Sequence, residues 1–325
     1  MSVPRFAEPH EIAREVTVVS ADDLPSWLEG QPGLVQAWLK GSGFEAGLGD
    51  LRLLPGPGGA VSAAVAGLGT AKARARLRFG IVKAFAGLPG GAWRLVGAGD
   101  QRLRDEAMLG ALLGQYRFDR YRAPKVAEPV VFVPEGVDAA RLLAMAEGEF
   151  LTRDLVNTPA SDMGPDELEA AFLALAARFG AKADVIRGSA LESGFPMIHA
   201  VGRASVRAPR LLDLRWGQAG PALTLVGKGV CFDTGGLDIK PSSGMLLMKK
   251  DMGGGGDRAG PCPYDHGAGG EGQAQGAGAC GRERDLWQCH AAARHSALAQ
   301  GIDGRGQRHR CRGAAGAGGR AGLCL

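Results

Sequence analysis

The sequence predicts an α/β protein in two parts: a smaller N-terminal α/β domain and a second α/β domain with a mainly parallel sheet covered by helices. Short β-branched segments alternate with segments of helical period. The 325 residues are enough for two separate cores. The composition changes abruptly at Gly253, so the second domain is expected to be incomplete at its C-terminus. The predicted parts are 1–128, 129–252 and 253–325.

The first 128 residues contain four predicted strands and one long helix. β-branched or alternating apolar residues mark the strands, and apolar residues at helical spacing mark the helix. Asp22 or Asp23 is a candidate cap for a helix that follows the first strand. The predicted strands are Glu15–Ser20, Leu51–Leu54, Val61–Val65 and Trp93–Val96, and the long helix is Glu106–Tyr116.

The second domain is predicted to follow a linker at Pro124–Pro129. A long amphipathic helix is expected from Asp138 to Asn157, and Pro165 places Asp166 in the first turn of the next helix. Apolar strands then alternate with helices, which is typical of a mainly parallel sheet. The predicted strands are Val130–Val133, Ala183–Arg187, Leu211–Arg215 and Leu223–Gly227.

The composition argues against a membrane-spanning or nucleic-acid-binding protein. No run of eighteen apolar residues is present, and the N-terminus lacks the apolar stretch of a signal peptide, so we expect a cytoplasmic location. The net charge is +4, but residues 253–325 hold nine Arg, no Lys and six acidic residues. Those residues therefore carry +3 and the remaining chain only +1, which argues against nucleic acid as a partner. Five of the six Cys also lie there, and Cys231 alone lies in the body.

The segment richest in chemical groups is Val226–Gly254, VGKGVCFDTGGLDIKPSSGMLLMKKDMGG, which includes the end of an expected strand. Ligand sites of α/β sheets gather at the carboxyl ends of strands, and glycines allow close backbone approach. The segment carries Lys228, Asp233, Lys240 and Asp251. Each of these alone could be a solvated turn residue. The GKG sequence lacks the spacing of a phosphate-binding loop.

Taken together, these residues resemble the site motif of the leucyl (cytosol) aminopeptidase family of two-metal exopeptidases. GKGVCFDTGGLDIKP and MKKDMGG carry the resemblance almost without a break. RDLVNTPASDM, at Arg153–Met163, resembles the start of the family's catalytic domain, and LLGQYRFDRYR resembles a pattern near its domain junction. The resemblance covers Glu106–Gly254 well and identifies residues 129–252 as the first part of a catalytic domain.

The resemblance implies a role for each matched residue. Lys228, as a neutral amine, together with Asp233 and Asp251 would bind two divalent ions, Mn²⁺ or Zn²⁺, with Asp233 between them. Lys240 would be the catalytic residue that stays charged and stabilises the oxyanion formed on the peptide carbonyl. The resemblance also implies a cytoplasmic homo-hexamer that acts on peptides with a free N-terminus and prefers leucine-like residues there.

One motif of the family is absent. In the family, TDAEGR supplies two further metal-binding carboxylates and an arginine that holds a bicarbonate. The sequence contains no TDAEGR. The chain therefore has three of the five implied ligand residues and lacks the arginine, and we predict that it is inactive.

Residues 253–325 have the composition of a segment translated in the wrong frame. They contain 20 Gly, four Leu, one Ile and no Val, Phe or Met, which cannot complete an apolar core. Codons can be chosen for His309–Ala317 so that reading from the second base gives TDAEGRLV. The same offset makes Ala279–Ala292 compatible with the family hallmark PAVENAISGNAMRP, and Gly256–His266 with the apolar AIALALAHMIM. Three segments in one register and the right order favour a one-base insertion in the codons for Gly253–Gly256.

Other interpretations of the sequence stay open. A natural disordered Gly/Arg tail would have the same composition. A zinc cluster is disfavoured because the tail has no C-x-x-C pair. For the whole chain, the alternatives are a non-catalytic binding protein that uses its N-terminal domain, and the unfolded product of a pseudogene.

Sequencing the gene across the codons for Asp251–Asp257 tests the frameshift. We expect one extra base, or an equivalent shift, in the run of G bases that encodes the four glycines. An uninterrupted family frame through these codons would refute the interpretation.

Overall fold

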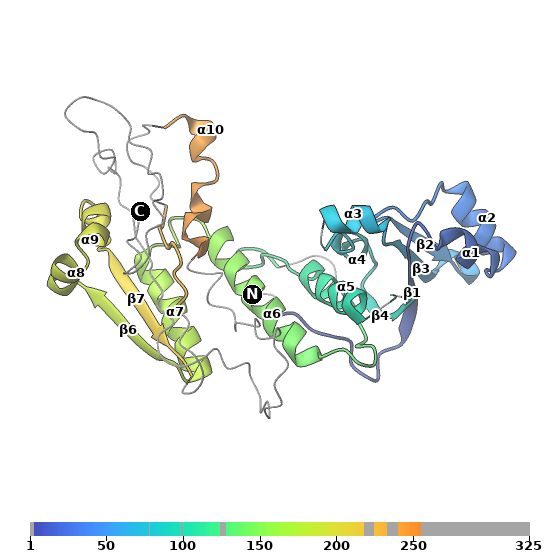
Figure 1. Ribbon diagram of the computed structural model, residues 1–325, viewed down its shortest axis with the longest axis horizontal. Helices are drawn as coiled ribbons and strands as arrows, with labels where there is room; N and C mark the ends of the chain where they lie inside the picture. Colours follow the sequence, from blue (N-terminus) through green and yellow to red (C-terminus); the bar gives the residue numbers. More distant parts are fainter. Residues whose placement is uncertain are drawn as a thin grey trace, which may run out of the picture.

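The computed structural model of the protein describes residues 3–77, 79–97, 99, 101–123, 128–217, 224–232 and 240–254. These residues form two lobes joined by the long helix α6 (Ala139–Asn157), which lies between them in Figure 1. No helix in these ranges is long and apolar enough to cross a membrane.

The first lobe is built on a five-stranded sheet with the order β2-β3-β1-β4-β5. Parallel pairs join β1 to β3, β1 to β4 and β4 to β5, whereas β2 runs antiparallel to β3. The sheet is therefore mainly parallel with one antiparallel edge strand. The strands are β1 (Ala13–Val19), β2 (Leu51–Pro55), β3 (Val61–Gly67), β4 (Gly91–Val96) and β5 (Pro129–Val131).

Helices cover both faces of this sheet because alternate strand residues point to opposite sides. Ala64 and Ala66 belong to one core, with α4, α5 and the first half of α6, while Val65 between them belongs to a second core with α1 and α2. The helices of this lobe are α1 (Leu24–Glu29), α2 (Gly33–Gly41), α3 (Ala71–Arg76), α4 (Val82–Ala86) and α5 (Gln101–Gly114), with a 3₁₀ turn η1 (Pro57–Gly59).

The second lobe contains a two-stranded antiparallel sheet, β6–β7, with helices on both faces. Leu212 and Leu214 of β7 pack toward α7 and the second half of α6, while Leu211 packs against α8 and α9. The elements are α7 (Pro165–Phe179), β6 (Lys182–Arg187), α8 (Ser189–Gly194), α9 (Pro196–Gly202), β7 (Arg210–Arg215), α10 (Ser242–Met245) and the 3₁₀ turn η2 (Met248–Met252).

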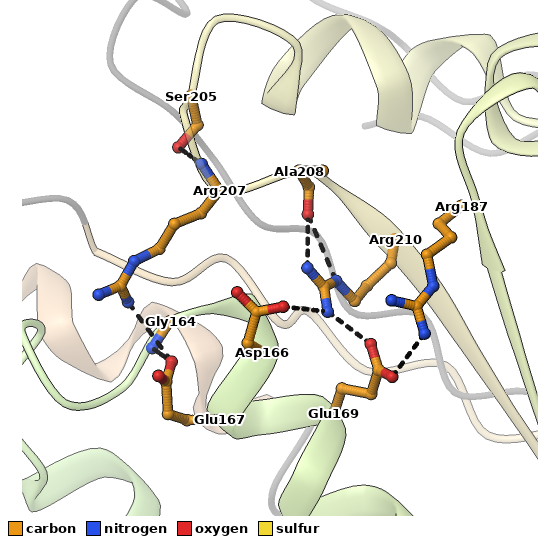
Figure 2. Close-up of polar contacts among 9 residues, drawn as sticks. All are labelled: Gly164, Asp166, Glu167, Glu169, Arg187, Ser205, Arg207, Ala208 and Arg210. Carbon is orange, nitrogen blue, oxygen red and sulfur yellow. Dashed lines mark hydrogen bonds and ion pairs between the residues drawn. The ribbon is translucent and has the colours of Figure 1, made fainter.

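A buried ion-pair cluster, shown in Figure 2, fixes α7 against β7. The guanidinium of Arg210, with 5% of its side chain exposed, contacts Glu169 and lies 2.7 Å from Asp166. Arg187 of β6 donates a 2.8 Å hydrogen bond to the other oxygen of Glu169. Beside this cluster, Arg207 contacts Glu167, whose carboxylate accepts from the backbone N–H of Gly164 at the start of the helix. Since Arg210 and Glu169 are nearly dry, removal of either side chain would leave the other charge poorly compensated.

Most predicted elements are present, and the α/β architecture of both parts is confirmed. The mainly parallel sheet lies in the first lobe, whereas the two strands described in the second lobe, where a mainly parallel sheet was predicted, pair antiparallel. Pro165 is the first residue of α7, as expected, and Asp138 caps α6 by accepting from the backbone N–H of Arg141. Asp23 is the N-cap residue of α1, but its side chain makes no capping bond and instead accepts from the Ser20 hydroxyl.

Two predicted strands differ from the structure. Val130–Val133 was expected to open the second domain, but Pro129–Val131 instead pairs with β4 and forms the edge of the first sheet. An isolated apolar segment does not reveal which sheet it joins, because pairing is a tertiary property. For Leu223–Gly227, residue 223 lies outside the described ranges and 224–227 form no strand. The linker core 124–127 and the tail 255–325 also lie outside them.

Removal of the Glu169 charge should destabilise the second lobe. We expect Glu169→Gln to lower the free energy of unfolding by about 2 kcal/mol, because Arg210 stays buried with a weaker set of partners. Urea unfolding measures this difference. Glu147→Gln is the matched control, since Glu147 pairs with the well-exposed Arg178 and should cost less than about 1 kcal/mol. Equal effects from the two variants would contradict the prediction.

Candidate metal centre

Two buried side chains anchor the motif segment to the second lobe. Cys231 follows Lys228 by three residues and is 4% exposed, and Met252 follows Asp251 and is 1% exposed. Both belong to the core formed with Leu155 of α6 and other residues of α7 and β7. Burial raises the pKa of the Cys231 thiol to about 12, so it acts as an apolar anchor rather than as a thiolate ligand.

A close backbone approach brings the two halves of the motif together. A methyl group built on Gly254 would lie 2.9 Å from the backbone nitrogen of Lys228 and 3.0 Å from its carbonyl oxygen. A methyl group on Gly253 would lie 3.0 Å from Val156 of α6. Because side chains cannot occupy these spaces without displacement, the glycine pair allows η2 to pack between α6 and Lys228.

This packing places a carboxylate between two ammonium groups. Lys228 Nζ donates a 2.6 Å hydrogen bond to Asp251 Oδ2. Lys250 Nζ donates a 3.0 Å hydrogen bond to the other oxygen, Oδ1. The Asp251 side chain is 28% exposed, so its carboxylate is partly sheltered but still reachable from solvent.

Partial burial acts to raise the pKa of Asp251, but the hydrogen bonds from Lys228 and Lys250 outweigh it and hold the pKa below the usual value. The carboxylate is therefore ionised at neutral pH. Lys228 lies at one of its oxygens and Lys250 at the other. An ionised carboxylate oxygen is a ligand that divalent cations accept, whereas a lysine can bind a metal only as the neutral amine.

The structure thus brings together two of the four residues predicted to form the site. Lys228 and Asp251 are in contact. Asp233 lies outside the described residues. Lys240 is exposed, and the contacts of the described part of the chain do not link it to Lys228 or Asp251. In those same ranges, no group of three His, Cys, Asp or Glu side chains could hold a metal ion.

A second polar cluster, to which the sequence pattern assigns no role, joins the two lobes. Tyr116, just after α5, donates a 3.0 Å hydrogen bond to Asp154 of α6 and accepts one of 3.1 Å from Asn157. Burial raises the pKa of Tyr116 to about 12, which keeps its hydroxyl protonated. Five residues later, Tyr121 contacts Asp162. The two family-like segments LLGQYRFDRYR and RDLVNTPASDM therefore bind each other, a pairing over about 40 positions that sequence spacing does not reveal.

Gly254→Ala tests the close approach. The added methyl group would collide with the Lys228 backbone, so we expect a loss of about 1–3 kcal/mol in the free energy of unfolding. Thermal or urea unfolding measures it. The control is Gly244→Ala in α10, where a methyl group meets no atom within 4 Å and alanine favours the helix. A Gly254→Ala protein as stable as the control would refute the packing.

Two sequence-family models match the chain. The catalytic domain of the cytosol aminopeptidase family matches residues 150–262, and the M17 aminopeptidase N-terminal domain matches residues 15–134. The first match contains Lys228 and Asp251. The second ends just after β5, which agrees with the place of that strand in the first sheet.

Relatives and solved structures agree with these matches. A protein named "Probable cytosol aminopeptidase" from Methylorubrum populi is 35% identical over 271 residues, which cover 74% of this chain and 54% of that protein. A crystal structure of the cytosol aminopeptidase from Coxiella burnetii is 40% identical, with a TM-score of 0.67, and the match covers 77% of this chain and 54% of that one. The bottromycin maturation enzyme BotP in complex with Mn is 34% identical, with a TM-score of 0.59 over 75% of this chain and 54% of that one.

The chain spans about half the length of these relatives. Both lobes nevertheless match, in sequence and in fold, and they do so in the same order. By its two domains and its motif segment, the chain belongs to the cytosol aminopeptidase family.

Proposed function

We propose that this protein derives from a metal-dependent aminopeptidase that hydrolyses N-terminal, leucine-like residues from peptides. One observation carries the proposal: the Lys228 side-chain nitrogen and the Asp251 carboxylate meet at 2.6 Å although they lie 23 positions apart in the chain. They belong to the motif through which the chain resembles the family, and this contact brings two of its proposed metal ligands together. The fold of both lobes supports the same conclusion.

In this proposal, Lys228, Asp233 and Asp251 hold two divalent ions, Mn²⁺ or Zn²⁺. Bound ions would supply Lewis-acid activation of water and of the peptide carbonyl. Lys228 must give up its proton to bind a metal, while Asp251 is already ionised. Lys240 would remain charged and stabilise the oxyanion that develops on the substrate carbonyl.

The same proposal holds that the chain as it stands is inactive. The match to the catalytic-domain model ends at residue 262, shortly after the proposed insertion at Gly253–Gly256. With the TDAEGR motif absent, the chain lacks two carboxylate ligands and the arginine that would hold bicarbonate. The intact protein would be a cytoplasmic homo-hexamer, as the family resemblance implies.

Restoration of the reading frame is the decisive experiment. We expect the present chain to show no hydrolysis of leucine-p-nitroanilide. A gene with one base removed from the codons for Gly253–Gly256 should encode a protein that hydrolyses it and loses activity with a chelator. Asp251→Asn in the restored protein should lower activity at least about 100-fold, because an ionised metal ligand is lost.

Calorimetry with MnCl₂ provides the control that does not depend on turnover. The restored protein should bind Mn²⁺, and its Asp251→Asn variant should bind it at least about tenfold more weakly. Chelator-sensitive hydrolysis by the present chain would contradict its predicted inactivity. A restored protein that folds, as seen by circular dichroism, but takes up no Mn²⁺ would remove the basis for the metal assignment.

A further inference from the structure

A cavity of about 440 Å³ lies between α6 and α7. Leu151 and Leu155 of α6 line it on one side, and Ala171 and Leu175 of α7 line it on the other. Phe118, from the segment that follows α5, also lines it. The volume and the mostly apolar walls are those of a site for a small molecule. None of the described residues of the motif segment lines this cavity.

Five polar or charged side chains of the described residues also line the cavity, and three of them are engaged elsewhere. The Thr158 hydroxyl donates a 2.7 Å hydrogen bond to the backbone of its own helix. Glu167 accepts from the backbone at the start of α7, and Arg178 pairs with a glutamate of α6. The two that remain are Asp154 and Arg120.

Asp154 and Arg120 carry opposite charges that do not neutralise each other by contact. Asp154 is 6% exposed, and its Oδ1 accepts a 3.0 Å hydrogen bond from Tyr116. Arg120 is exposed, and its guanidinium lies 5.8 Å from the centre of the Tyr121 ring. Among the contacts of the described residues, no ion pair joins Arg120 to Asp154 or to another carboxylate. The cavity therefore has a negative group and a positive group at separate points of an apolar lining.

Burial makes Asp154 a favourable partner for a cation. Desolvation raises the pKa of Asp154, although the hydrogen bond from Tyr116 and the charge of Arg120 act in the opposite sense. An ammonium group beside this carboxylate would compensate the charge that burial leaves exposed to an apolar surrounding. Arg120 in turn offers the planar donor group that carboxylates bind best.

We propose that this cavity binds a free amino acid with a large apolar side chain. The ammonium group would lie next to Asp154, the carboxylate next to Arg120, and the side chain between the leucines of α6 and α7. A ligand with a single charge would leave one of the two protein charges without a partner. The inference goes beyond the proposed function and does not depend on it, since the described metal-motif residues lie outside the cavity.

Calorimetric titration of the full chain with L-leucine, in the presence of a chelator, tests the ligand class. Leucine should bind with saturation. Leucinamide lacks the carboxylate and 4-methylpentanoate lacks the ammonium group, so each should bind about tenfold more weakly. Glycine keeps both charges but has no apolar side chain, and it should bind at least about tenfold more weakly than leucine.

Two charge variants assign the two ends of the ligand. Arg120→Gln should lower the affinity for leucine about tenfold and change that for leucinamide by less than about twofold. Asp154→Asn keeps an oxygen acceptor for Tyr116 and should weaken both leucine and leucinamide about tenfold. Circular dichroism checks that both variants fold.

A cavity-filling variant places the ligand. Ala174 of α7 lines the cavity, so Ala174→Leu should abolish leucine binding. Ala177→Leu is the matched control, because Ala177 is also exposed on α7 but is not part of the lining. It should bind leucine within about twofold of the wild type, and thermal unfolding should show similar stability for the two variants, since both add a leucine to an exposed helix position.

The outcomes separate this inference from the proposed function. Absence of saturable leucine binding overturns the inference and leaves the metal assignment untouched. Equal affinity for leucine and leucinamide, or full binding by Ala174→Leu, also overturns it. Asp251→Asn should leave leucine binding unchanged. If it weakens leucine as much as Asp154→Asn does, leucine binds at the candidate metal centre and the assignment to the cavity is wrong.

Discussion

The candidate centre depends on one steric constraint, the contact between the backbones of Gly254 and Lys228. A side chain at position 254 would occupy the space in which the Lys228 backbone lies. Because Gly254 has no side chain, η2 packs beside Lys228, and the Lys228 side chain reaches the Asp251 carboxylate. Electrostatic attraction strengthens the arrangement, but an exposed lysine alone could not order two loops. The buried Met252 and Cys231 supply that order.

Helix α6 links this constraint to the rest of the molecule. Its first half, with Leu142 and Ala146, belongs to the core of the first lobe, and its second half, with Leu155, belongs to the core beneath the motif segment. The packing of this helix therefore stabilises both lobes. The hydrogen bonds from Tyr116 to Asp154 and from Asn157 to Tyr116 add a polar connection at the same junction. The N-terminal domain thus contributes to the site because it packs against α6, and the motif segment packs against the other half of the same helix.

The elements were predictable where local pattern and final environment agree. Alternation along β3 follows from its two covered faces, since Ala64 and Ala66 meet one core and Val65 the other. The prediction was wrong where distant parts of the chain decide which sheet a segment joins. Pro129–Val131 has the composition of a strand in either domain, and only its pairing with β4 assigns it to the first sheet. Residues 224–227 are apolar enough for a strand but form none in the structure.

The sequence by itself determined the family, the α/β class, and the residue types of the candidate centre, because these are written in contiguous motifs. The proposal that Lys228 and Asp251 are metal ligands comes from the family resemblance and needs no geometry. Only the tertiary structure decided that these two groups meet, that Lys250 takes the second carboxylate oxygen, and that Tyr116 joins the lobes through Asp154. The physical reason is that hydrogen bonds and steric contacts act over a few ångströms. Residues far apart in the chain come that close only when the buried cores fix their backbones.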